Sequence, residues 1–366
     1  MTMTMPRHTR PSNYRQYSIF RFSAPHSFNA LLIPMVLSLT GYAHANPIDE
    51  ANQALKEQNI SEAIRVLQRA ADNGDAAAKG LLSNHLRNFP PPYKDVERAC
   101  KLAKEASDSG DAMGLVTRTE CILTGTEKTF HPISQARHFA RLAWKKGSPA
   151  GGFMLYLVYS QDPQYRYNEN GKFSQSKYDA LAAMPVKART DQIEALEALS
   201  DAMNTGHINA VIMGLAYLSD SAAPDNIDRM LSLSRFLQKN GEKTPPEITS
   251  TLKVAQEINR LGNSYVSPSL FRNILNSTVP TAAIKLKQTD NTPCDLMKIK
   301  LSKMKAEPIS DPEYLPISGN ALKNSYLLKG SWAETWTFEG CGKSTVMQLN
   351  FTADGWSGAR FTAATE

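Results

Sequence analysis

AIRVLQRAADNGDAAAKGLL, residues 63–82, is the stretch of sequence that decides the fold. Its first apolar residues are three and four positions apart, at Ala63, Val66 and Ala70. This spacing places them on one face of a helix. Gly74 ends that helix, because glycine adopts the left-handed backbone conformation at low cost. The helical spacing resumes afterwards at Ala78 and Leu82, so the stretch predicts two antiparallel helices joined by a tight turn.

The same pattern surrounds four further glycines, Gly110, Gly147, Gly206 and Gly241. The five glycines are 36, 37, 59 and 35 residues apart, and the short intervals are the period of helical-hairpin repeats. The residues eleven, eight and four places before each glycine are apolar in all five copies, and alanine fills most of the first and last columns. The long interval contains an insert of about residues 162–187, which is rich in Tyr, Asn and Gln.

At these positions the sequence resembles the Sel-like repeats, which are relatives of the tetratricopeptide repeats. Their pattern is roughly Ala-Ala-x-x-Gly-x-x-x-Ala-x-x-x-Leu-Gly-x-x-Tyr, and it is best matched over residues 70–82 and 147–159. The second repeat departs from the pattern, with Arg118 where leucine is expected. The resemblance implies a curved stack of antiparallel helix pairs whose concave face is the usual binding surface. It also implies an adaptor, a regulator or an envelope-associated binding protein rather than an enzyme.

A last helix is expected before Gly262, with a face made by Leu252, Ala255 and Ile258. After it, prolines punctuate the chain and strand-like runs replace the helical spacing. Residues 282–286 are interpreted as a strand or as part of a linker, and residues 297–301 as a further candidate strand.

The last 40 residues predict an antiparallel meander. Trp332, Trp336 and Phe338 alternate with small or polar residues, and Gly340-Cys341-Gly342 predicts a turn before a strand at residues 346–352. At Asp354-Gly355 we expect a three-residue hairpin loop that places Leu349 opposite Phe361. A domain this small buries little apolar surface, so it needs a disulfide.

The N-terminus has the layout of a secretory signal. Residues 1–29 contain four arginines and no acidic residue, an apolar run follows, and small residues precede Ala45. We therefore predict cleavage between Ala45 and Asn46. The alternatives are an uncleaved anchor or a buried helix, but the apolar run is short for a membrane span and contains Pro34. We expect no stable membrane insertion after cleavage, and a location in the periplasm or outside the cell.

Cleavage changes the charge of the protein. The whole chain has 41 basic and 35 acidic residues, and four of the basic ones lie before Ala45, which leaves 37 against 35. A nearly neutral mature protein gives little electrostatic reason to expect a nucleic acid partner.

The four cysteines, all in the mature part, predict two disulfides. Cys100 and Cys121 stand ten and eleven residues from Gly110, so an antiparallel hairpin that turns there brings them together. The alternative is two buried thiols. Cys294 and Cys341 are then expected to pair within the β domain. The cysteines and histidines lack the spacing of zinc ligands, and no cofactor is expected.

Several short motifs suggest catalysis but lack their companions. Gly342-Lys343-Ser344 lacks the first glycine of a phosphate-binding loop, and residues 355–359 lack the last glycine of a nucleophile elbow. Ser174 and Ser302 each stand three residues before a lysine, as in penicillin-recognising enzymes, but the other motifs of those enzymes are absent. His131 and His138 are interpreted as surface or capping residues. A hydrolase or a β-lactam-interacting enzyme is therefore the weakest alternative.

Aromatic residues give the one positive indication of a binding surface. The candidate residues are Trp144, Tyr156, Tyr159, Tyr165, Arg166 and Tyr167. Tyrosine, tryptophan and arginine are typical of the residues that anchor an interface. The alternative is that these side chains form the core of the insert.

These patterns together predict an α+β multidomain protein. We expect a signal peptide at residues 1–45, an all-α helical-hairpin solenoid at 46–262, a linker at 263–290 and a small antiparallel β domain at 291–366. The predicted function is that of an exported, non-catalytic scaffold for a protein or peptide partner. The main alternative is a secreted effector or inhibitor.

Overall fold

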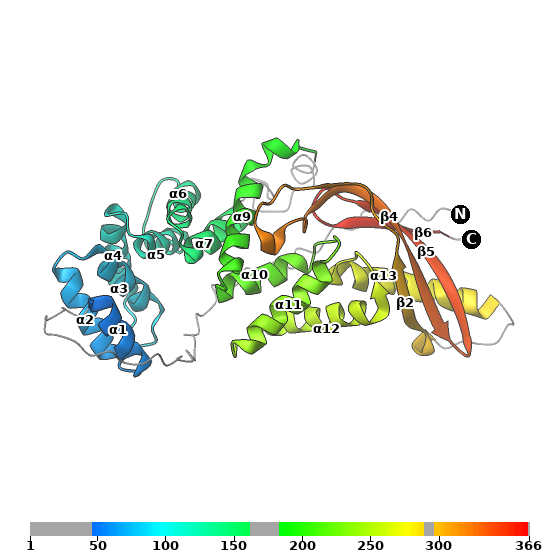
Figure 1. Cartoon of the computed structure of the whole chain (residues 1–366), viewed down its shortest axis with the longest axis horizontal. Coiled ribbons are helices and arrows are strands. Elements are labelled where there is room, and N and C mark those ends of the chain that lie inside the picture. The colour runs from blue at the N-terminus through cyan, green and yellow to red at the C-terminus, as the bar shows by residue number, and fades with distance from the viewer. Residues whose placement is uncertain (1–45, 162–182, 289–295, 365–366) are drawn as a thin grey trace, which may run out of the picture. The chain divides into compact units, whose positions relative to one another are not determined.

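Helices fill the first part of the chain, and a sheet joins them in the second (Figure 1). The computed structural model describes residues 46–161, 183–288 and 296–364. Contacts divide the chain into two compact units, with the boundary between Asp162 and Pro163. We call residues 46–161 the first unit, and residues 183–288 with 296–364 the second unit.

The first unit is a stack of helices in the order α1 (Pro47–Lys56), α2 (Ile60–Asp72), α3 (Ala76–Asn88), α4 (Val96–Asp108), α5 (Ala112–Leu123), α6 (Pro132–Lys145) and α7 (Pro149–Gln161). The pairs α2–α3, α4–α5 and α6–α7 are the first three predicted hairpins. Each hairpin also packs on the next one, through α3 with α4 and α5, and through α5 with α6 and α7. The first unit is therefore a helical-hairpin solenoid, as the sequence predicts.

Every repeat glycine closes its helix in the same way. All five have positive φ, between 71° and 92°. The N–H of the following residue donates to the carbonyl four residues before the glycine, as from Asp75 to Ala70 (3.1 Å) and from Asp111 to Ala106 (3.0 Å). These are the bonds of a Schellman helix end.

The residue after the glycine also begins the next helix. The Asp75 carboxylate accepts from the N–H of Ala78 (3.0 Å), and that of Asp111 accepts from Gly114 (2.6 Å). Ser148 and His207 cap the third and fourth hairpins at the same position. One residue therefore ends the first helix with its backbone and starts the second with its side chain.

The alanine columns form the contacts between the two helices of a hairpin. The column eleven residues before the glycine is at most 1% exposed, and consists of Ala63, Ala99, Ala136, Ala195 and Met230. In the second and third hairpins, the column four residues before the glycine faces a glycine on the second helix. A Cβ added to Gly114 would lie 2.5 Å from the Cβ of Ala106, so only glycine fits where these helices cross.

The second unit continues the repeat and then leaves it. Its helices are α9 (Thr190–Asn204), α10 (Ile208–Leu218), α11 (Asn226–Lys239), α12 (Pro246–Leu261) and α13 (Pro268–Gln288), with short 3-10 turns η2 (Val186–Ala188), η3 (Leu296–Lys298) and η4 (Asn320–Leu322). The hairpin α9–α10 is the predicted fourth repeat. Helix α11 is the first helix of the fifth repeat, and α12 is the expected last helix.

A six-stranded sheet packs against these helices (Figure 1). Its strands are β1 (Gly262–Asn263), β2 (Lys300–Ala306), β3 (Ser310–Tyr314), β4 (Leu327–Gly340), β5 (Lys343–Ala353) and β6 (Ala359–Ala364). The order is β1-β2-β4-β5-β6, and β3 also pairs with β4. Only the short β1–β2 pair is parallel. As predicted, the side chains of Trp332, Trp336 and Phe338 are buried, and helix α13 packs on this region of β4 and on β5.

The segment that the sequence predicted as a linker is largely helical. Helix α13 covers residues 268–288, including the stretch around Ala282 for which a strand was considered. Its buried side chains repeat every three or four residues, at Phe271, Ile274, Thr278, Ala282 and Leu286. Pro280 lies inside this helix on its exposed side, where the missing N–H costs less than the apolar stripe contributes. The unit boundary also falls before α9, well ahead of the predicted solenoid end at residue 262.

The prediction of a three-residue loop between the last two strands is wrong. Ala353 pairs with Ala359, which leaves a five-residue loop and places Phe351, not Leu349, opposite Phe361. The Asp354 carboxylate explains the longer loop, because it accepts from the N–H groups of Trp356 (2.7 Å) and Gly358 (3.0 Å). These local bonds favour a wider turn than the tight hairpin expected from Asp-Gly.

Candidate functional site

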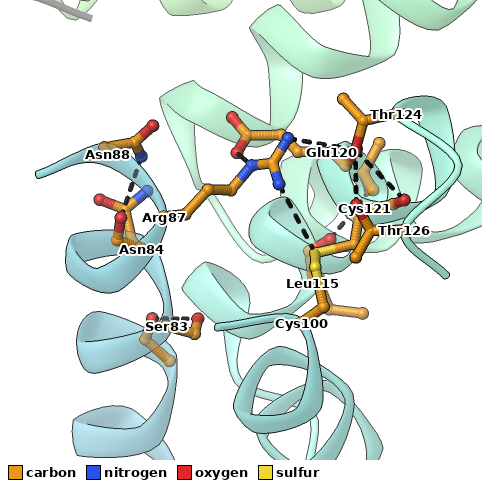
Figure 2. A network of polar contacts seen from close by, with 12 residues as sticks. Ser83, Asn84, Arg87, Asn88, Cys100, Leu115, Glu120, Cys121, Thr124 and Thr126 are labelled. Atoms are coloured by element: carbon orange, nitrogen blue, oxygen red, sulfur yellow. Dashed lines mark hydrogen bonds and ion pairs between the residues drawn. A yellow bond between two sulfur atoms is a disulfide. The ribbon is translucent and has the colours of Figure 1, made fainter. Parts of the chain in front are cut away.

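The predicted disulfide between Cys100 and Cys121 is present in the first unit (Figure 2). It joins α4 to α5, and the two Cα atoms are 5.8 Å apart. Both side chains are buried, so the bridge lies inside the second hairpin rather than on its surface.

An ion pair lies beside this disulfide and joins two hairpins. Arg87 on α3 reaches Glu120 on α5, with 2.8 Å between Nε and Oε2, and each side chain is 10% exposed. Figure 2 shows the guanidinium between this carboxylate, the Thr124 hydroxyl and the sulfur of Cys121. Burial raises the pKa of Glu120, and the charge of Arg87 opposes that shift. The pair therefore links the first hairpin to the second.

Arg118 shows why the second repeat departs from the leucine pattern. Its guanidinium pairs with Asp108 (2.8 Å) and Glu127 (3.0 Å), and its Cζ lies 4.3 Å from the centre of the Phe139 ring. Because Phe139 lies on α6, Arg118 links the second hairpin to the third. A charged network thus replaces the apolar contact that leucine provides in other repeats.

Of the two cysteines in the second predicted disulfide, the structure describes only Cys341. Cys341 is disulfide-bonded, at the turn between β4 and β5. Cys294 lies outside the described residues, so its pairing with Cys341 stays a prediction.

The aromatic residues proposed as a binding surface are partly described. Trp144 on α6, and Tyr156 and Tyr159 on α7, are half-buried. Tyr165, Arg166 and Tyr167 lie outside the described residues, as do Ser174 and Ala45. Asn46, the predicted first residue of the mature chain, caps α1 by accepting from the N–H of Ile48 (3.1 Å).

The exposed sides of α2, α4 and α6 repeat along the first unit. The buried columns on α2, α4 and α6 leave the positions nine, five and two residues before each glycine on the opposite side. A shallow pocket of about 450 Å³ lies on α2 and reaches Arg98 of α4. Polar side chains that line it have partners: Arg65 pairs with the neighbouring Glu62, and Gln68 bonds to both Arg98 and Asp72.

The remaining chemical motifs are not assembled into a site. Ser302 donates to the carbonyl of Thr337, and Lys305 pairs with Glu307, so neither faces the other. The described residues contain no group of three or more His, Cys, Asp or Glu side chains placed to hold a metal ion. In the same part of the chain, no helix combines the length and the apolar character that a bilayer crossing requires.

Sequence reasoning missed a buried carboxylate in the sheet. Glu334 is 0% exposed and accepts four hydrogen bonds, from Ser264 Oγ (2.7 Å), Tyr265 N (3.0 Å) and the indole N–H groups of Trp332 and Trp336 (2.9 Å each). The signal was present, because a glutamate two residues from each tryptophan shares their inward face on a strand. Four donors satisfy the carboxylate, which makes it a structural centre of the second unit.

A second buried polar network joins the helices to the sheet. Asn226 at the start of α11 donates to the carbonyl of Ser325 (3.2 Å), and the Tyr217 hydroxyl lies 3.3 Å from Ser325 Oγ. Burial raises the pKa of Tyr217 to about 12. These bonds hold the segment before β4 on α10 and α11, which explains why the last helices and the sheet form one unit.

Comparisons with known proteins give a fold likeness only. No family model matches the chain, and no curated protein does. One similar solved structure is a Sel1 repeat protein from Oxalobacter formigenes, with 16% identity over 60% of this chain and 91% of that chain, at a TM-score of 0.32. Another is c5321, a protective antigen present in uropathogenic Escherichia coli strains that displays an SLR fold, with 12% identity over 66% and 58% of the two chains, at a TM-score of 0.30. The prediction of Sel-like hairpins agrees with the caps and packing described above.

Proposed function

We propose that the chain is an exported, non-catalytic scaffold that binds a protein or peptide partner through its helical repeats. The observation that carries this proposal is the register of α2, α4 and α6. Their alanine columns fix one side of each helix against its hairpin partner, so the other side presents a repeated set of positions. The exposed side chains there include Arg65, Arg69, Lys101, His138, Leu142 and Lys145. Stacked repeats use such extended surfaces for binding.

Export is supported by the buried disulfide. A bridge such as Cys100–Cys121 forms and persists in oxidising compartments, including the periplasm and the extracellular space. The signal layout before Ala45 points to the same compartments. We therefore place the mature chain in the periplasm or outside the cell.

Trp144, Tyr156 and Tyr159 remain part of the proposed surface. They lie on the third hairpin, Trp144 on α6 and Tyr156 and Tyr159 on α7. Aromatic side chains that are half-buried in the free protein can add contact area at little entropic cost. They are therefore suited to the margin of an interface.

The test is a cross-linking experiment on the oxidised full chain. The protein is incubated with periplasmic and envelope extract, treated with a lysine-reactive cross-linker, and read by mass spectrometry. We expect one specific partner, with cross-links concentrated at Lys101, Lys104 and Lys145. Lys253 on α12 and Lys285 on α13 serve as internal controls. Recovery of nothing above an extract-only control, or cross-links spread evenly over both units, would contradict the proposal.

A further inference from the structure

Charge is distributed unevenly along the first unit. Residues 46–127 contain ten basic and thirteen acidic residues, for a net charge of −3. Residues 128–161, which include the whole third hairpin, contain five basic residues and no acidic one. Residues 128–161 therefore have a net charge of +5, and its sign is opposite to that of residues 46–127.

The exposed side of α6 collects part of this charge. His131, His138, Leu142 and Lys145 are exposed and are seven, four and three residues apart, so they form one stripe along the helix. The opposite side of α6 is fixed in the core by Ala136, Ala140 and Ala143, each 0% exposed. The stripe is therefore set by packing and does not depend on a mobile side chain.

Two apolar side chains accompany the charges. Phe130, in the loop that leads into α6, is 98% exposed, and Leu142 is 37% exposed. Covering such a phenylalanine with a partner is favourable, because its apolar surface then leaves water. Lys128 is exposed two residues earlier. We call Lys128, Phe130, His138, Leu142 and Lys145 the α6 face.

The earlier repeats show that the α6 face differs from the rest of the stack. Two residues before the glycine, α2 has Asp72 and α4 has Asp108, whereas α6 has Lys145. Five residues before it, α2 has Arg69 and α4 has Glu105, whereas α6 has the apolar Leu142. Within the first unit, the position two residues before the glycine is thus acidic in the first two hairpins and basic in the third.

We propose that the α6 face binds an acidic peptide segment that carries at least one apolar side chain, and this inference rests on the proposed scaffold function. The acidic side chains of the partner pair with Lys128 and Lys145, and its apolar side chain covers Phe130 or Leu142. From His131 to Lys145 the stripe is about 21 Å long, at 1.5 Å per residue of helix. An extended peptide of about six or seven residues matches that length.

Other anionic partners fit this surface less well. Recognition of an anionic membrane surface usually needs a cluster of four to eight basic residues, and a nucleic acid needs a similar number of phosphate contacts. The third hairpin and its leading loop have three exposed lysines, Lys128, Lys145 and Lys146, which is fewer than such a cluster. A short acidic segment with an apolar anchor uses both kinds of side chain that the face offers.

The test selects peptides from a random 12-residue display library on the oxidised full chain. Enriched peptides are then synthesised with a fluorescent label, and their affinity is measured by polarisation. The variant K128E/K145E reverses two charges on the α6 face. The matched variant K239E/K253E reverses two exposed charges on α11 and α12 of the second unit, outside the proposed binding surface, and gives the same change in net charge. We expect the selected peptides to be rich in Asp and Glu, and to bind K128E/K145E about tenfold more weakly, as expected from the loss of about 1.4 kcal/mol.

The outcomes separate the inference from the function it rests on. Selection of neutral peptides, or an equal loss of affinity in both variants, would overturn the proposal that the α6 face binds acidic peptides. The proposed scaffold function would remain. Failure to enrich any peptide would contradict peptide binding itself. Vesicles of phosphatidylglycerol are tested in parallel, and binding to these vesicles that K128E/K145E alone abolishes, without peptide enrichment, would reassign the face to membranes. The variant F130A tests the apolar contact. If it binds the peptides as tightly as the wild type, the proposed contact with Phe130 is wrong.

Discussion

The contacts that stabilise each of the two units join residues at different separations along the chain. In the first unit most contacts join neighbouring helices, and the described polar bonds reach at most 37 residues along the chain, from Arg87 to Thr124. In the second unit, polar bonds join Ser264 to Glu334 at a separation of 70 residues and Arg189 to Gly355 at 166. A change in the first unit should therefore act on one or two hairpins, whereas a change in the second should act on helices and sheet together.

The largest expected effect is in the second unit. Substituting Glu334 by alanine leaves four buried donors without their acceptor, and should lower the free energy of unfolding by about 4 kcal/mol. Three of the four tryptophans, Trp332, Trp336 and Trp356, lie in this unit, so tryptophan fluorescence in urea reports its unfolding. The control is E339A, which changes an exposed glutamate on the same strand. Equal stability of the two variants would show that the network around Glu334 contributes little.

Removing the disulfide tests the independence of the first unit. The double variant C100A/C121A opens a loop with a sequence separation of 21 residues, which should lower the free energy of unfolding of the first unit by about 3 kcal/mol. Hydrogen exchange read by mass spectrometry separates the two units. We expect faster exchange in α3 to α6 and no change in β4 and β5. Faster exchange in the sheet as well would show that the two units unfold together.

Acid should weaken the first unit through His85. Burial lowers the pKa of this ring to about 4, and in an unfolded chain it is about 6.5. The unfolded state therefore binds the proton first, and the free energy of unfolding falls as the pH drops from about 6.5 to about 4. Because the side chain is only partly buried, we expect the free energy of unfolding to fall by about 1–2 kcal/mol, which is less than the whole pKa shift would give.

The variant H85F removes this titration and keeps a ring against Phe89, on which His85 stacks at 4.7 Å. Its first unit should lose much less stability in acid than that of the wild type. The second unit provides the comparison, because burial also lowers the pKa of His207 and that residue is unchanged. If H85F loses as much stability as the wild type over this pH range, His85 is not the titrating group.

The contrast between the units also explains which parts of the fold could be predicted. The hairpins were predictable because their determinants are local: Gly74 and Asp75 end one helix and start the next within a few residues. The Cys100–Cys121 bridge followed from the same turn geometry. Helix α13 was missed because Pro280 suggests a break, and only packing against the sheet shows that Ile274 and Thr278 belong to a buried stripe.

The candidate site was harder to predict for the same reason. Arg118 looked like a defect in the repeat until Asp108, Glu127 and Phe139 were placed around it. The α6 face depends on exposure, and the sequence does not show that Phe130 faces water whereas Phe139 packs under Arg118. Binding surfaces are defined by what the fold leaves uncovered, and periodicity alone does not give that.

The smallest expected effect tests whether a change in one hairpin of the first unit stays confined to that hairpin. The Asp75 side chain caps α3, and D75A should lower the free energy of unfolding by about 1 kcal/mol. The control D72A changes an exposed aspartate in the last turn of α2 and should cost about 0.5 kcal/mol or less. Thermal unfolding followed by circular dichroism measures both. Because each cap serves one hairpin, D75A should increase exchange in α2 and α3 while α6 and α7 stay protected. Equal loss of protection along the whole stack would mean that the first unit is as cooperative as the second, and the contrast between them would not hold.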